Sequence, residues 1–167
     1  IDVGAEQADW VKAEAFAEVL SADVPELRMA AVNGLGDLGS ANAVSELRDR
    51  FDDPDPRVRA RAARACGRIA DPSAVDGLES LLDDRYADVR REAAEALGAI
   101  GSRRALRALL SLYRDEDVRV RRIAVSAFGN FDTDRPVEYL VAALTDPRTS
   151  VRRTAVFSLV ELLSNVP

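Results

Sequence analysis

Residues 53–67 read Asp-Pro-Asp-Pro-Arg-Val-Arg-Ala-Arg-Ala-Ala-Arg-Ala-Cys-Gly, and this stretch decides the fold because its pattern returns every 31 residues. A branched apolar residue fills the position of Val58 in five copies, without a gap: Leu27, Val58, Val89, Val120 and Val151. The next position is always arginine: Arg28, Arg59, Arg90, Arg121 and Arg152. Five copies in one register predict a continuous repeat array.

Each copy contains two helical patterns. Apolar residues follow the position of Val58 at spacings of four, eight and eleven, which is the period of a helix. A second periodic run precedes it, as at Val75, Leu78 and Leu82. No stretch alternates long enough for a strand. We therefore predict an all-α, right-handed α-solenoid of five two-helix repeats of 31 residues, in a single domain over 1–167 with repeats at about 8–39, 40–70, 71–101, 102–132 and 133–165.

The consensus Asp-Pro-x-x-x-Val-Arg-x-x-Ala-Ala-x-Ala-Leu-Gly-x-Ile resembles HEAT repeats, specifically the short type named after phycobilisome lyases, over about residues 10–165. An aspartate and an arginine six residues apart, as in Asp53 and Arg59, resemble the HEAT pair that ties successive repeats. The resemblance implies this structural role for the arginines named above and for Asp53, Asp84, Asp115 and Asp146. HEAT repeats serve many unrelated roles, so the resemblance does not name the function.

Composition narrows the function classes. The chain has no histidine, which excludes Ser-His-Asp and Cys-His catalysis and most zinc sites. It also shows no glycine-rich phosphate loop. The single cysteine, Cys66, cannot form an internal disulfide and stands in an apolar column, so we expect a buried thiol. The acidic turns could hold Ca²⁺ or Mg²⁺, but helix capping explains them better. We expect no enzyme activity, no metal and no cofactor.

The net charge and the length of the apolar runs indicate which partners and which location to expect. A net charge of −6 disfavours general nucleic-acid binding, which depends on neutralising phosphates. The apolar runs are shorter than the roughly 20 residues that span a bilayer, and no secretory segment is visible. We expect a cytoplasmic protein that binds another protein or peptide, without nucleic acid or membrane.

Charged residues on the outward side of the second helices predict ion pairs between repeats. In this register Arg57 stands beside Asp88, Arg61 beside Glu92 and Arg64 beside Glu95. Arg68 stands beside Asp37 on the other side. Since helices pack about 8–10 Å apart, long side chains at these positions can meet.

A second row of residues is the better candidate for binding. Arg91, Arg122 and Arg153 follow one another near the starts of three second helices, where anions are favoured. The residues predicted to bind a partner on the concave face are Arg91, Arg122, Arg153, Ile123, Phe157 and Arg119. The alternatives are that the arginines neutralise nearby acidic turns and that Phe157 packs under a missing sixth repeat. The apolar C-terminal end also permits end-to-end self-association.

The leading hypothesis is therefore a non-catalytic protein–protein interaction scaffold. One alternative, implied only by the resemblance, is a bilin or tetrapyrrole lyase or a subunit associated with one. A further alternative is a nucleic-acid-binding HEAT protein, although the acids at Asp88, Glu92 and Glu95 argue against it.

Overall fold

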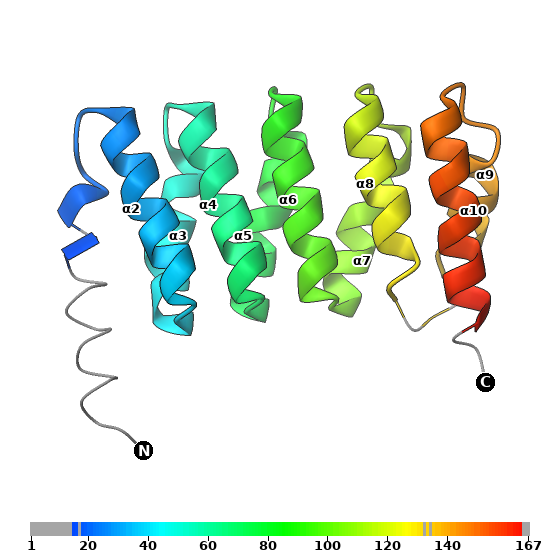
Figure 1. The fold of residues 1–167 in the computed structure, drawn as a ribbon, viewed down its shortest axis with the longest axis horizontal. Helices are drawn as coiled ribbons and strands as arrows, with labels where there is room; N and C mark the ends of the chain where they lie inside the picture. Colours follow the sequence, from blue (N-terminus) through cyan, green and yellow to red (C-terminus); the bar gives the residue numbers. More distant parts are fainter. Residues whose placement is uncertain (1–14, 17, 132, 134, 165–167) are drawn as a thin grey trace, which may run out of the picture.

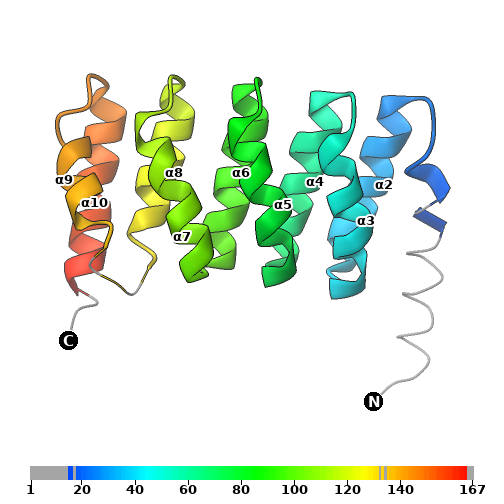
Figure 2. The ribbon, with the colours of Figure 1, turned by 180° about the vertical axis from the view of Figure 1, so that it is seen from behind.

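The computed structural model describes residues 15–164 except 17, 132 and 134, and within these it is built of helices in two layers (Figures 1 and 2). No strand occurs in this part of the chain. The long helices stand side by side in one layer, here called the B layer: α2 (Pro25–Leu38), α4 (Pro56–Ile69), α6 (Ala87–Ile100), α8 (Val118–Phe128) and α10 (Thr149–Ser164). They are the predicted second helices of the repeats.

The other layer, here called the A layer, holds the short first helices of four repeats, which Figure 2 shows in front. They are α3 (Val44–Arg48), α5 (Val75–Ser80), α7 (Arg103–Leu109) and α9 (Val137–Ala143). Tight 3₁₀ turns flank most of them: η1 (Ala41–Ala43), η2 (Asp49–Asp52), η3 (Pro72–Ala74), η4 (Leu81–Asp83) and η5 (Leu110–Arg114). The first helix expected for repeat 1, from Trp10 to Leu20, lies largely outside the described residues.

The core lies between the two layers. Val58, Val89, Val120 and Val151 are fully buried, as their column predicts. Leu27 is the exception, since it is 51% exposed. Cys66 is buried, and burial raises the pKa of its thiol to about 12.

Glycines let neighbouring B helices approach closely. A Cβ atom placed on Gly67 would lie 2.8 Å from the Cα atom of Ala96 on the next helix. Gly36, Gly98 and Gly129 meet the next helix in the same way. In α10 the equivalent position is Val160, whose side chain is 58% exposed. Close packing, rather than the exit of the helix, therefore explains this glycine column.

A chain of arginine–aspartate pairs, here called the ladder, runs along the turns between A and B helices. The Nε and Nη2 atoms of Arg59 donate to the two carboxylate oxygens of Asp84, at 2.7 and 3.1 Å. The same two-bond pairs join the repeats at three other places: Arg28–Asp53, Arg90–Asp115 and Arg121–Asp146. Planar two-bond pairing is the strong form of this contact.

The ladder corrects one detail of the predicted pairing. Six residues separate Arg59 from Asp53, but Arg59 contacts only the backbone oxygen of Asp53, at 2.7 Å. Its carboxylate partner is Asp84, 25 residues further on. The reason is that the bond to the Asp53 backbone oxygen fixes the Arg59 side chain within its own turn. The remaining N–H groups of the guanidinium then face the next repeat. Arg152 makes the first contact, with the Asp146 backbone oxygen at 2.8 Å, but no carboxylate of the described residues pairs with it.

Candidate interaction surface on the B layer

The outward side of the B layer carries most of the charged residues singled out by the sequence, but the structure pairs them differently. Arg64 donates to both carboxylate oxygens of Glu92, at 2.9 and 2.6 Å, and not to the predicted Glu95. Arg61 reaches back to the Asn33 side chain at 3.4 Å and not forward to Glu92. Arg64 and Glu95 hold equivalent positions on neighbouring helices, and their side chains point in the same direction rather than toward each other. The Arg64 side chain, which reaches toward α6, therefore meets Glu92, three residues earlier.

The pairs at the ends of the helices follow the predicted columns, though not always with the predicted partner. Arg68 pairs with Asp37 at 2.6 Å, as predicted. Arg57 pairs with Asp55 and, at 3.1 Å, with Glu26 of the preceding helix, so the predicted partner Asp88 was wrong. Asp88 instead receives Arg119 of the following helix, at 2.9 Å. In the pairs that join two helices, the arginine reaches back along the array.

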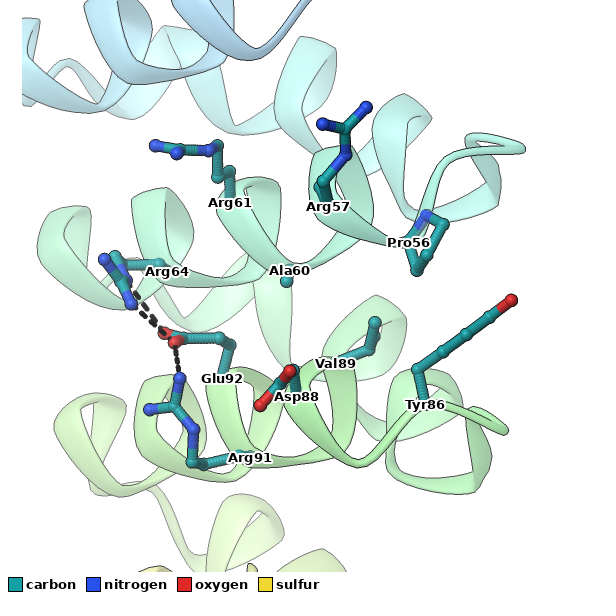
Figure 3. A pocket seen from close by; sticks show the side chains of 10 residues that line it. All are labelled: Pro56, Arg57, Ala60, Arg61, Arg64, Tyr86, Asp88, Val89, Arg91 and Glu92. Carbon is teal, nitrogen blue, oxygen red and sulfur yellow. Dashed lines mark hydrogen bonds and ion pairs between the residues drawn. The ribbon is translucent and has the colours of Figure 1, made fainter. Parts of the chain in front are cut away.

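Arg91 takes part in a charge cluster around the buried carboxylate of Glu92. Its guanidinium contacts Glu92 and, at 3.4 Å, Glu95. Glu92 therefore accepts from Arg91 and Arg64 together, and only 4% of its side chain is exposed (Figure 3). Burial alone would raise the pKa of Glu92, but the two guanidinium groups lower it overall. Glu92 is thus a charged carboxylate held between two cations.

The other candidate binding residues lie further along the array. Arg122 on α8 and Arg153 on α10 are exposed, and Ile123 is half-buried against the core. Phe157 on α10 is 63% exposed. Arg119 is engaged with Asp88 and with Asp117, and its guanidinium lowers the pKa of Asp117 to about 2. The structure does not gather these residues into one pocket.

A cavity of about 250 Å³ opens between α4 and α6, on the outward side of the B layer (Figure 3). The side chains around it are Pro56, Arg57, Ala60, Arg61, Arg64, Tyr86, Asp88, Val89, Arg91 and Glu92. Ala60 explains why there is space. The four other repeats carry a long side chain at this position: Met29, Arg91, Arg122 and Arg153. A methyl group in place of a long side chain leaves the floor of the cavity open.

Tyr86 forms one rim of the cavity and is 40% exposed. It stands at the start of α6, where α4 and α8 have the capping aspartates Asp55 and Asp117. The guanidinium of Arg85 lies 4.8 Å from the centre of the Tyr86 ring, which places a cation over an aromatic face. The Asp84 carboxylate accepts from the Tyr86 backbone N–H at 2.9 Å, as Asp53 and Asp115 accept from Asp55 and Asp117, so the Tyr86 side chain leaves the capping bond of α6 unmade.

Sequence reasoning missed this cavity although both of its signals were visible. The column that contains Ala60 holds three arginines, which draw attention to charge, whereas its one small residue is the signal of the cavity. The tyrosine that replaces a capping aspartate was likewise a local departure from the repeat. Departures of this kind identify where a regular surface is modified.

The side chains on this surface can bind, but they do not form a catalytic pair. The charged groups of the described residues around the cavity are arginines and carboxylates, and most are in ion pairs. Cys66 is buried with a raised pKa, which disfavours a nucleophilic thiolate. Across the described residues, His, Cys, Asp and Glu form no group of three that could hold a metal ion. None of the helices in this part of the chain is long and apolar enough to cross a membrane.

Two layers of helices, one long and one short, repeated along one direction and tied by a ladder, define an α-solenoid of armadillo-like type. The family model for HEAT repeats matches residues 13–97 and 76–160, and the chain therefore belongs to the HEAT-repeat family. No curated protein matches the chain.

Solved structures agree with this fold. The complex of CpcE and CpcF of phycocyanin lyase from Nostoc sp. PCC7120 has a TM-score of 0.80 at 22% identity, covering 91% of this chain and 65% of that chain. The chain thus spans about two thirds of that relative. An engineered protein has a TM-score of 0.70 at 24% identity, covering 92% and 80%. A designed armadillo repeat protein in complex with the peptide (KR)4 has a TM-score of 0.71 at 21% identity, covering 88% and 80%. Similarity at this identity shows the fold alone.

Proposed function

We propose that this protein is a non-catalytic scaffold that binds another protein, or a peptide segment of one, on the outward side of its B layer. The observation that carries the proposal is the cavity over Ala60. It is a break in an otherwise regular surface, and it combines an apolar floor with charged walls. Binding hot spots cluster in pockets of this kind, where an anchor side chain is shielded from water.

Two further features support the proposal. HEAT-type solenoids commonly act as interaction scaffolds, and their extended faces suit a long partner. The ion pairs beside the cavity also hold its walls in place before binding: Arg64 and Arg91 are fixed by Glu92, and Asp88 is fixed by Arg119. A surface that is already ordered loses less conformational entropy when a partner binds.

The cavity can be tested with a single substitution. Ala60→Arg introduces the residue found at this position in three other repeats, so we expect the helix to fold normally and the cavity to be filled. Ala142→Arg adds the same charge at an exposed site on α9, in the A layer, and is the matched control. The immobilised protein should capture a partner from a lysate of its source organism, and Ala60→Arg should lose it while Ala142→Arg keeps it. Equal capture by all three proteins would refute the proposal.

We propose further that the partner extends along the B layer over Arg122 and Arg153 to Phe157. Both arginines are exposed, and Phe157 offers an aromatic side chain on α10. The double reversal Arg122→Glu and Arg153→Glu should weaken capture about tenfold or more. The new glutamates would repel the partner groups that face the two arginines, because like charges across an interface repel. Reversal of Arg103 and Arg107, which lie on α7 in the A layer, makes the same charge change and should have little effect. If both double variants weaken capture equally, net charge and not this surface is responsible.

A further inference from the structure

We infer that a second pocket, beside α7 in the A layer, binds a small organic phosphate. The pocket has a volume of about 700 Å³ and lies between α7 and the segment that leads into α9. The described residues that line it include three arginines, Arg103, Arg107 and Arg135, and no carboxylate. This site is separate from the surface proposed for the protein partner and goes beyond the proposed function.

The connection between α8 and α9 makes room for the pocket. At the preceding junction only two residues separate α6 from α7. By contrast, residues 129–136 separate α8 from α9, and α8 has 11 residues where α4 and α6 have 14 (Figure 1). Phe131 of this longer connection contributes to the wall of the pocket. The pocket therefore arises where one repeat departs from the common length of its second helix.

The repeat register places two of the arginines opposite each other. One repeat earlier, Arg104 on α7 reaches back to α5 and pairs with Asp76 at 2.7 Å and with Glu79 at 3.2 Å. At the repeat distance of 31 residues, Arg135 takes the position of Arg104, but Arg107 takes the position of Asp76. A pair of opposite charges at one junction thus becomes a pair of cations at the next. An anion bound between these two cations would remove their repulsion.

Arg103 adds a third cation, because it stands four residues before Arg107 and so on the same side of α7. All three arginines are exposed, and none of the ion pairs between described residues includes them. The α8–α9 connection also contains Asp132 and Asp134, which lie outside the described residues. With both acids counted, the local charge is still 3 − 2 = +1.

The charge and the size of the pocket indicate the class of ligand. A phosphate monoester concentrates a charge of about −1.5 to −2 and three acceptor oxygens in one group. Guanidinium groups bind such oxygens in planar, two-bond pairs. A volume of about 700 Å³ also falls within the roughly 300–1,000 Å³ of pockets for small organic ligands. Leu106 and Phe131 supply an apolar base on which the organic part can rest.

Isothermal titration calorimetry with phenyl phosphate tests the ligand class on the intact protein. We expect phenyl phosphate to bind about tenfold more tightly than inorganic phosphate, because its ring covers the apolar base. Phenol, which has the same ring without the charge, should not bind measurably. Absence of phenyl phosphate binding, or tighter binding of the dicarboxylate phthalate, would overturn the inference.

Two substitutions with the same charge change locate the site. Arg107→Asp restores an acid at a position where the flanking repeats carry Asp76 and Glu138, so it should fold and lose phenyl phosphate binding by about tenfold or more. Arg148→Asp is the matched control, since it places aspartate where α4 and α8 have a capping aspartate, and should bind as the wild type does. Equal weakening by both variants would mean that net charge is responsible, which contradicts the inference.

Thermal unfolding gives a second measurement that also reports on folding. Saturating phenyl phosphate should raise the unfolding temperature of the wild type and of Arg148→Asp, but not that of Arg107→Asp, because a ligand stabilises only the state that binds it. Arg103→Ala, at an exposed helix position, should reduce the shift severalfold. An equal shift for all four proteins would refute the assignment.

The outcomes keep this site distinct from the proposed scaffold function. Phenyl phosphate binding by a protein that captures no partner retains the site and refutes only the scaffold. Partner capture by a protein that binds no phenyl phosphate retains the scaffold and overturns the site.

Discussion

At the residue scale, Asp84 combines two tasks in one side chain. It accepts two hydrogen bonds from Arg59 of the preceding repeat and a third from the backbone of Tyr86 at the start of α6. We expect Asp84→Asn to cost about 3 kcal/mol of unfolding free energy, since it leaves a buried guanidinium without its counter-charge. Asp37→Asn breaks the exposed pair with Arg68 and should cost less than about 1 kcal/mol.

Urea unfolding followed by circular dichroism measures both variants. The comparison is controlled because each variant removes one charge from an arginine pair between repeats. Similar losses for the two variants would mean that burial of the ladder does not determine its contribution to stability.

Gly67 is a residue at which the usual preference of a helix should be reversed. Alanine normally stabilises a helix by about 1 kcal/mol relative to glycine. In Gly67→Ala the new methyl group would lie 2.8 Å from the Ala96 backbone, so we expect a net loss of about 1–2 kcal/mol. Gly98→Ala meets only the Ala127 side chain at 3.0 Å, with the backbone 4.0 Å away, and should change stability by less than about 0.5 kcal/mol. Thermal and urea unfolding of both variants would check this order.

Residue columns could be predicted from the sequence, but partners within them could not. The arginine and aspartate columns are a property of the repeat and were found by spacing alone. Which carboxylate Arg59 or Arg64 contacts depends on the direction of a side chain and on the offset between parallel helices. Two acids on the same side of one helix, such as Glu92 and Glu95 for Arg64, are less than one helical turn apart, so spacing does not choose between them.

At the scale of elements, the ladder makes the junctions between repeats sensitive to acid. Burial would raise the pKa of Asp53, Asp84 and Asp146, but their arginine partners lower it below the ordinary value of 3.8. A carboxyl whose pKa is lower in the folded state stabilises the fold above its unfolded pKa. This stabilisation is lost as the pH falls through the folded pKa.

We therefore expect the urea midpoint to be nearly constant from about pH 7 to pH 5 and to fall steeply below about pH 4. Asp84→Asn should show a shallower fall, because one of the titrating ladder carboxylates is absent. Urea titrations of both proteins at each pH provide the measurement. A wild-type midpoint that rises below pH 4 would contradict the assignment of these pKa directions.

The identity of the elements was easier to predict than their detail. Apolar spacing alone placed the helices of both layers, because each layer buries one continuous stripe. It did not reveal that the A helices are short and flanked by 3₁₀ turns, since the same apolar residues fit either helix type. Apolar spacing also did not reveal the cavity. The cavity results from one small residue, Ala60, which leaves the spacing of the buried apolar residues unchanged.

At the scale of the whole molecule, the constant spacing makes the repeats removable as units. Deletion of residues 71–101 would bring Arg59 to Asp115 and Gly67 to Ala127, which are the partners that the register provides. Deletion of residues 102–132 would bring Arg90 to Asp146 and Gly98 to Ser158. We expect both shortened proteins to fold, with a urea m-value lower by about a fifth, because this value scales with the surface exposed on unfolding.

Binding should separate the two deletions. The first removes Tyr86 and Val89, and with them one wall of the cavity, so partner capture should be lost. The second keeps every residue that lines the cavity and should retain at least part of the capture. The same lysate capture, performed on both proteins after their folding is verified, provides the measurement. Capture by the first and not by the second would move the binding surface to α7 and α8.

On α10, Val160 takes the position that glycine occupies in the four preceding repeats. This change affects where further repeats can be added to the array. New units copied from the middle would bring their own glycine and could be inserted between existing units without a steric conflict. A unit added after α10 in the same register would meet the branched side chain of Val160, where other junctions have no side chain at all. Gene duplication or protein engineering can therefore insert a unit between existing units, whereas a unit placed directly after α10 first requires Val160→Gly.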